Sequence, residues 1–258
     1  MNNSTNFFHT IVFCFTLLFL SACFQGKHTS VDQQTDRSIS WFEGYRMAEL
    51  LEHPIKINEL SDIKRIMTKK WYSSVIVSSP VNLKNQIELS SCSMYFQEKA
   101  EGMRPIKKYE ASAYMEIAMM CIATRAIVKS KPAQKSFIGN ILFDESLPMR
   151  LPAKMALVIS ESESTAFLPA EKNLTWNNIN KISKVEVINR FHAIYSHLGG
   201  SQEVELVAQG DFNGDSVEDL IITSRDSVES GSYSAFRMFL VTKFSHGEKY
   251  IILKEYKY

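Results

Sequence analysis

The chain of 258 residues is 45% hydrophobic and carries 29 Lys and Arg against 28 Asp and Glu, which is a formal net charge of +1. A nucleic-acid partner demands a basic face, so this near-neutral balance argues against one. The hydrophobic fraction is ordinary for a globular protein, and the chain is long enough for one good core or two small ones.

The N-terminal segment has the pattern of an export signal. Residues 7–20, FFHTIVFCFTLLFL, are apolar apart from one histidine and two threonines. That run is too short for a membrane-spanning helix of about 20 residues, and it has the length of the apolar core of a secretory signal. Small residues follow in the sequence Leu20-Ser21-Ala22-Cys23. This sequence resembles the lipobox of bacterial lipoproteins, Leu-[Ala/Ser]-[Gly/Ala]-Cys, although the first ten residues carry no Lys or Arg.

The resemblance implies that residues 1–22 are a signal peptide, cleaved after Ala22, and that Cys23 receives fatty acyl chains such as palmitate. Several acyl chains, at about 0.8 kcal/mol per buried CH₂, hold a protein stably on a membrane, whereas one chain gives marginal binding. Phe24 rather than Asp follows the cysteine, which in enteric-type sorting implies the outer membrane, facing the periplasm. The alternative is an ordinary secretory signal that leaves Cys23 as a free thiol.

Two cysteines remain in the body of the exported chain. Cys14 leaves with the signal and Cys23 takes lipid, so Cys92 and Cys121 are left. In an oxidising periplasm two thiols are expected to form one disulfide. The alternative is two separate buried thiols. A catalytic dithiol is disfavoured because the chain has no C-x-x-C pattern.

Residues 41–168 are predicted to be a helix-rich part, which follows a polar, flexible tether at 23–40. Apolar residues at helical spacing predict helices at residues 41–54, 58–71 and 107–129. Runs of β-branched and aliphatic residues predict strands at 71–79 and 154–160. Residues 85–100 are ambiguous, with helix favoured.

From Lys184 onward the apolar residues alternate with period two. Five strands are predicted, at residues 184–197, 203–209, 220–225, 233–244 and 249–256. Short connections between them favour an antiparallel meander, so we expect an α+β fold with its β part over 169–258. His192 and His197 lie five apart in one predicted strand, on opposite faces, which predicts ordinary sheet histidines rather than metal ligands.

The stretch GDFNGDSVEDL, residues 210–220, concentrates oxygen-bearing side chains between two predicted strands. Loop positions 1, 3, 5 and 9 are Asp211, Asn213, Asp215 and Asp219. Carboxylates this close repel one another unless a cation lies between them. Calcium, which we favour over magnesium, takes about six to eight oxygen ligands, and the backbone carbonyl of Val217 at position 7 would add one.

This loop resembles the Asp-x-Asn-x-Asp-Gly-x-x-Asp calcium loop of the FG-GAP (integrin-type) repeats, which connects two strands. The resemblance implies one calcium ion with a structural rather than catalytic role. It does not extend to a propeller, because the chain holds one copy, and an EF-hand is excluded because position 12 is Ile222. Ser216 stands where the family has Gly, so a positive φ there would be strained and would lower affinity. The alternative is an Asx-rich turn without an ion.

Sequence motifs of the common enzyme classes are absent. The chain has no G-x-S-x-G, H-E-x-x-H, P-loop or G-x-G-x-x-G pattern, so we assign no catalytic residues. The favoured function is a non-enzymatic lipoprotein, anchored through Cys23, that binds another envelope protein as an immunity or inhibitor protein or as a maintenance factor. The alternative is a hydrolase that acts on envelope material, with its catalytic residues dispersed along the chain.

Overall fold

The computed structural model describes residues 38–79, 82–158, 174–229, 231 and 233–258. The predicted signal peptide, Cys23 and residues 23–37 of the predicted tether lie outside the described residues, and so do the last two residues of the strand predicted at 154–160. Contacts join the described residues into one unit, which runs from Asp36 to Tyr258.

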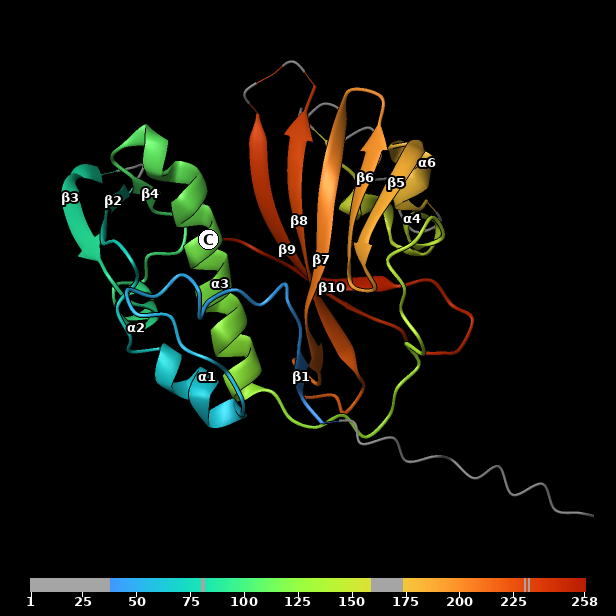
Figure 1. Cartoon of the computed structure of the whole chain (residues 1–258), viewed down its shortest axis with the longest axis horizontal. Coiled ribbons are helices and arrows are strands. Elements are labelled where there is room, and N and C mark those ends of the chain that lie inside the picture. The colour runs from blue at the N-terminus through green and yellow to red at the C-terminus, as the bar shows by residue number, and fades with distance from the viewer. Residues whose placement is uncertain (1–37, 80–81, 159–173, 230, 232) are drawn as a thin grey trace, which may run out of the picture. The chain divides into compact units, whose positions relative to one another are not determined.

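An antiparallel sheet dominates the C-terminal part, as Figure 1 shows. Its strand order is β10-β9-β8-β7-β6-β5, and β1 extends it by pairing with β7 beyond the end of β6. The strands are β1 (Ser40–Trp41), β5 (Ile182–Asn189), β6 (His192–His197), β7 (Gly200–Gly210), β8 (Asp219–Val228), β9 (Ser234–Thr242) and β10 (Ile251–Tyr256). The predicted α+β class and antiparallel sheet are confirmed. The strand predicted at 184–197 is instead the hairpin of β5 and β6, so the meander has six strands rather than five.

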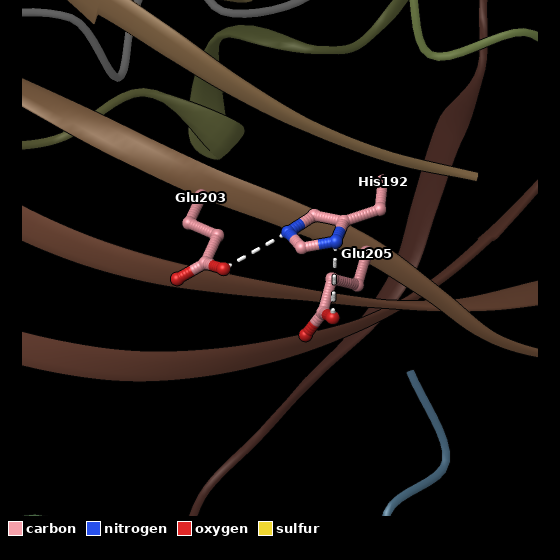
Figure 2. Close-up of side chains that lie close together, drawn as sticks. All are labelled: His192, Glu203 and Glu205. Atoms are coloured by element: carbon pink, nitrogen blue, oxygen red, sulfur yellow. Dashed lines mark hydrogen bonds and ion pairs between the residues drawn. The ribbon is translucent and has the colours of Figure 1, made fainter. Parts of the chain in front are cut away.

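Both faces of this sheet are buried, because successive side chains of a strand point to opposite sides. In β8, Ile221 belongs to one core and its neighbour Ile222 to the other. The charged side chains of β7 lie on the Ile221 side, where Glu203 and Glu205 flank His192 of β6 (Figure 2). We call the Ile221 side the α3 face and the Ile222 side the loop face, after the chain that covers each.

The α3 face is covered by helix α3 (Ala111–Lys129), which follows the 3-10 turn η1 (Lys108–Glu110). Behind α3 lie α1 (Leu60–Ile66), α2 (Cys92–Gln97) and a small sheet of β2 (Val75–Ser79), β3 (Asn82–Leu89) and β4 (Arg104–Pro105). Together with η1, α3 is the one helix among the described residues that is long and apolar enough to cross a membrane. More than half of its most apolar stretch is buried in the protein, as in a core helix.

Several elements of the helix-rich part match their predictions. The helices predicted at 58–71 and 107–129 are confirmed by α1 and by η1 with α3, and the strand predicted at 71–79 is confirmed by β2. The ambiguous residues 85–100 divide between the end of β3 and α2, so the favoured helix is present only in their second half.

The helix predicted at 41–54 is wrong, because this segment lies along the sheet as a series of turns. The N–H of Phe42 donates to the carbonyl of Val207 at 3.0 Å. A Cβ on Gly44 would lie 2.5 Å from the carbonyl oxygen of Leu206, so the glycine lets the backbone approach β7. Pairing and close packing against the sheet outweigh a helix propensity that is worth tenths of a kcal/mol per residue.

The loop face is covered by irregular chain with short helical turns. These are α4 (Leu147–Arg150), η2 (Ala153–Met155) and α6 (Trp176–Ile179). The strand predicted at 154–160 is wrong over its described residues, because side chains of the sheet satisfy its backbone. Arg237 donates to the carbonyls of Met155 and Ala156 at 2.8 and 3.0 Å, and Gln202 donates to Met155 at 2.8 Å. These donors replace the ladder that a strand would need.

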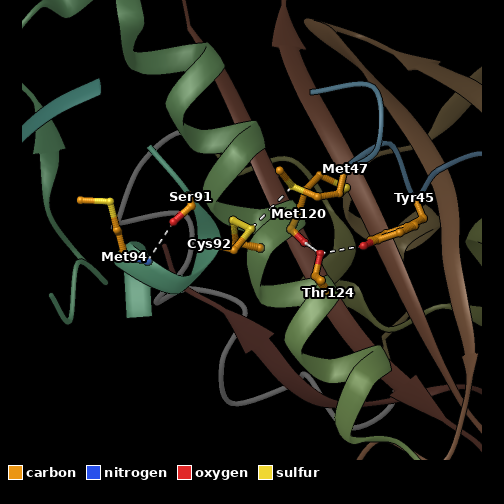
Figure 3. Close-up of a disulfide and its surroundings, with 8 residues drawn as sticks. Tyr45, Met47, Ser91, Cys92, Met94, Met120 and Thr124 are labelled. Atoms are coloured by element: carbon orange, nitrogen blue, oxygen red, sulfur yellow. Dashed lines mark hydrogen bonds between the residues drawn. A yellow bond between two sulfur atoms is a disulfide. The ribbon is translucent and has the colours of Figure 1, made fainter. Parts of the chain in front are cut away.

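The two cysteines left by the export prediction join α2 to α3. Cys92 and Cys121 lie at disulfide-bonding distance, with their Cα atoms 5.1 Å apart, and both are fully buried. Figure 3 shows Met47 and Met120 beside the bond, and the sulfur of Met47 lies 3.8 Å from that of Cys92. Helix α3 also packs on the large sheet. The disulfide therefore joins α2, which lies beside the small sheet, to the helix that covers the large sheet.

We expect the variant Cys92→Ala/Cys121→Ala to lose roughly 3–4 kcal/mol of unfolding free energy, measured by urea denaturation, because a 29-residue separation closes a loop of substantial entropy. Each single variant should lose nearly as much as the double variant, since either change breaks the same bond. Additive single losses would instead indicate two independent buried thiols.

Candidate functional site

The acidic loop connects the end of β7 to the start of β8, as the sequence predicts. Its backbone is pinned by the chain that follows α3. Asp211 and Lys131 exchange two backbone hydrogen bonds of 3.1 Å, and the carbonyl of Ser216 accepts from the N–H groups of Gln134 and Lys135 at 2.9 and 3.1 Å. These backbone hydrogen bonds fix the loop to the segment that follows α3.

Side chains of the loop accept hydrogen bonds from its own backbone. The carboxylate of Asp211 accepts from Gly214 and Ser216 at 2.6 and 2.9 Å, and that of Asp215 accepts from Val217 at 2.8 Å. The Asx-turn alternative also predicts such bonds. A carboxylate oxygen has two lone pairs, so these bonds leave room for a cation.

The loop tip is exposed and contains one strained residue. Asn213 and Asp215 are exposed, and Asn213 donates to the Asp215 carboxylate at 2.9 Å. Gly214 has φ +87° and Ser216 has φ +69°. Ser216 thus adopts the left-handed conformation in which an L-residue costs about 1–2 kcal/mol, as anticipated for a position at which the FG-GAP loop has Gly.

Asp219 is the buried member of the loop. Its side chain is 0% exposed, and Oδ2 accepts from the N–H of Phe212 at 3.1 Å. The other oxygen, Oδ1, is buried without a hydrogen-bond partner in the part of the chain that the structure describes. The pKa of Asp219 is raised to about 6, chiefly by burial and also by the charges of Asp215 and Asp211, against the opposing effects of the Phe212 amide and the Thr242 hydroxyl. A cation would remove both the burial penalty and the repulsion.

Oxygen donors of this kind suit a hard ion such as calcium rather than a soft metal. The structure does not gather the three loop carboxylates, however, because among the described residues only His192, Glu203 and Glu205 bring three ligand atoms within 4.8 Å of one another. Two of the candidate carboxylates are buried, one carboxylate and one amide are exposed, and the candidate backbone carbonyl belongs to a half-buried residue. These residues are Asp211, Asp219, Asp215, Asn213 and Val217.

A second charged cluster lies on the α3 face. Figure 2 shows the ring of His192 between two carboxylates, and its Nε2 lies 2.9 Å from Glu203 while its Nδ1 lies 3.6 Å from Glu205. One ligand atom from each of the three residues lies within 4.8 Å of the others, a spacing that one metal ion could bridge. The carboxylates, however, face different ring nitrogens, so an ion on one nitrogen would lie away from the other carboxylate.

Two arginines neutralise this cluster. Arg46 donates to both oxygens of Glu205 at 2.8 and 2.9 Å and to Glu116 of α3 at 3.0 Å. Arg225 of β8 donates to the other oxygen of Glu116 at 3.0 Å, and its Nε lies 3.8 Å from Glu203. The guanidinium groups already supply positive charge to the glutamates of this cluster. The cluster is therefore better explained as an ion-pair network that fastens the 41–54 segment and α3 to the sheet.

A cavity of about 430 Å³ opens beside His192, lined by Trp41–Gly44 and Asn189–His192. His192 was predicted to be an ordinary sheet histidine, and the two glutamates beside its ring were not anticipated. His197 lies on the loop face, with Nδ1 3.0 Å from the carbonyl of Leu198. One signal was available in the sequence: Glu203 and Glu205 alternate with apolar residues in a predicted strand, so both carboxylates had to share one face.

Comparison of the chain with protein-family models, with curated proteins and with solved structures finds no match. The function therefore has to follow from the residues of the loop, the ion-pair network and the surfaces around them.

We expect Arg46→Met to lower the unfolding free energy by about 2–4 kcal/mol, because it leaves the buried Glu205 without its arginine and Glu116 with Arg225 alone. Lys184→Met is the matched control. It removes an ion pair whose side chains are 70% and 56% exposed, so its effect should stay below about 0.5 kcal/mol. Equal losses in urea denaturation would contradict a structural role for the network.

Proposed function

We propose that the protein is a non-enzymatic lipoprotein, anchored through Cys23 on the periplasmic side of the outer membrane, that binds another protein of the envelope. The lipobox supports the anchor. One observation favours binding over catalysis: both ring nitrogens of His192 are directed at carboxylates. A general base needs a ring nitrogen that can reach the substrate, and His192 is committed to the network instead.

A hydrolase is the second candidate, and the cavity beside His192 is what favours it. Its walls come from the segment that leads out of β1 and from the β5–β6 turn, and they include aromatic and charged side chains. If Glu203 or Glu205 moved aside, His192 would have a free nitrogen at the edge of this cavity. Protein binding and hydrolysis therefore predict different effects of the substitution His192→Gln. A binding protein should keep its partner, whereas a hydrolase should lose activity.

We further propose that the acidic loop holds one calcium ion through Asp211, Asn213, Asp215, Asp219 and the carbonyl of Val217. The unpartnered, buried oxygen of Asp219 is the main support. The ion would stiffen the β7–β8 connection, a structural role, because the carboxylates would be used as ligands. An envelope protein meets divalent ions outside the cytosol, which is consistent with the anchor.

The partner proposal is tested with the mature, full-length lipoprotein, affinity-purified from native outer membranes after cross-linking. We expect one stoichiometric protein partner, recovered equally by His192→Gln, which keeps a hydrogen-bond donor near Glu203. Turnover of peptidoglycan or phospholipid by the purified protein, lost in His192→Gln without loss of folding, would instead establish the hydrolase.

The calcium proposal predicts a higher melting temperature in calcium than in EGTA for the wild type, and no such shift for Asp215→Ala. Because the pKa of Asp219 is raised from 3.8 to about 6 in the folded protein, its contribution to stability is fully present below pH 3.8 and is lost as pH rises through about 6. In EGTA, Asp219→Asn should therefore gain more stability over the wild type at pH 7 than at pH 5. In calcium at pH 7 it should be the less stable protein. Identical wild-type melting temperatures with calcium and EGTA would refute the site.

A further inference from the structure

A groove lies between the small sheet and the large one, with a volume of about 790 Å³. One wall is the edge strand β4 with Ile106 and with Lys108 of η1, and Met115 of α3 also lines the groove. The opposite wall is Ser234, at the start of β9, together with the C-terminal Tyr258. Strand edges from both sheets therefore meet in this groove.

The start of β9 is an open edge of the large sheet. β8 pairs with β9 along its whole length, from Ser234 to Thr242, but β10 pairs only with the part from Met238 onward. The chain then leaves the sheet, and a backbone oxygen of Tyr258 accepts from the N–H of Gly102 at 2.7 Å. Figure 1 shows this half of β9 at the edge of the sheet, next to the C-terminus.

Within the described residues, no strand covers the open half of β9, and it contains neither a proline nor a lysine. Natural proteins block such edges with Pro, Lys or a covering element, because unpaired backbone groups recruit another strand. The sequence here is Ser-Ala-Phe-Arg, residues 234–237. The charged side chain of Arg237 does not guard the edge, since its Nε donates to Asp226 on the loop face at 2.6 Å.

The other wall of the groove supplies positive charge and apolar surface. Arg104 and Lys108 are exposed, and neither has an ion-pair partner within the described ranges. Ile106 is 44% exposed between them, and Tyr233, beside the start of β9, is 39% exposed. A ligand complementary to this wall carries negative charge interspersed with apolar groups.

We propose that this groove binds an extended, acidic segment of a partner protein, which adds as a strand to residues 234–237 of β9. The inference rests on the proposed protein-binding function and locates its surface. Backbone hydrogen bonds to an open edge supply affinity, while side chains that alternate along the added strand supply specificity. Acidic residues of the segment would face Arg104 and Lys108, and apolar ones would cover Ile106 and Met115. Because four residues make a short edge, the charges should contribute much of the specificity and the association rate.

The test uses the mature full-length protein and a labelled ten-residue peptide that alternates Glu and Val. We expect binding by fluorescence anisotropy, weakened by added salt, and slower hydrogen exchange at residues 234–237 in the complex. Arg104→Glu/Lys108→Glu should lose at least about tenfold in affinity for this peptide and gain affinity for the matching Lys-Val peptide. The control Lys184→Glu, on β5 at the other end of the sheet, should bind the Glu-Val peptide like the wild type.

Three outcomes would contradict the proposal that this groove binds an acidic segment. The first is equal affinity of the wild type for the Glu-Val and Lys-Val peptides, and the second is peptide protection elsewhere than β9. The third is a wild type that sediments as a dimer whose interface protects residues 234–237, which would make the occupant a second copy. Recovery of the native partner by Arg104→Glu/Lys108→Glu would place binding elsewhere while leaving the binding function intact, whereas envelope hydrolysis without a partner would refute that function itself.

Discussion

The pairing of β7 with β8 is the constraint on which the rest of the structure depends. These strands are buried on both faces, whereas many antiparallel sheets keep one face in water. Each strand therefore needs apolar residues on both sides, and each polar residue between them needs a partner. The acidic loop closes this pair at one end, and α3 packs on β7 and on β9, the neighbour of β8.

The two faces meet this requirement in different ways. On the α3 face, ionised side chains pair across the boundary, and Arg46 joins the sheet to α3 through two glutamates. On the loop face, Gln202 and Arg237 satisfy backbone carbonyls of an irregular segment. Charged residues that resemble a catalytic set are in this way used to hold chain segments in place. For the proposed binding function, the available surfaces are the strand edges, where backbone groups of the sheet remain unpaired by another strand.

The sequence predicted the elements that a local pattern defines, either a run of helix formers or an alternation of apolar and polar residues. The helix α3 has a long run of helix formers, and the C-terminal strands alternate, so both followed from the sequence. The helix predicted at 41–54 failed because a glycine brings that backbone onto β7, a contact no local pattern reveals. The ion-pair network was out of reach for the same reason, since Arg46 and Glu205 lie 159 residues apart. The acidic loop was recognisable because its oxygen-bearing residues are contiguous in the sequence, yet the burial of Asp219 could be seen only in the fold.

Native-state hydrogen exchange tests the central role of the β7–β8 pair most directly. Amides buried on both faces open only with global unfolding, so those of β7 and β8 should exchange most slowly, with free energies equal to that of the whole protein. Faster exchange in β7 and β8 than in α3 or in the small sheet of β2 and β3 would contradict the account, because the covering layers would then outlast the strands that are supposed to support them.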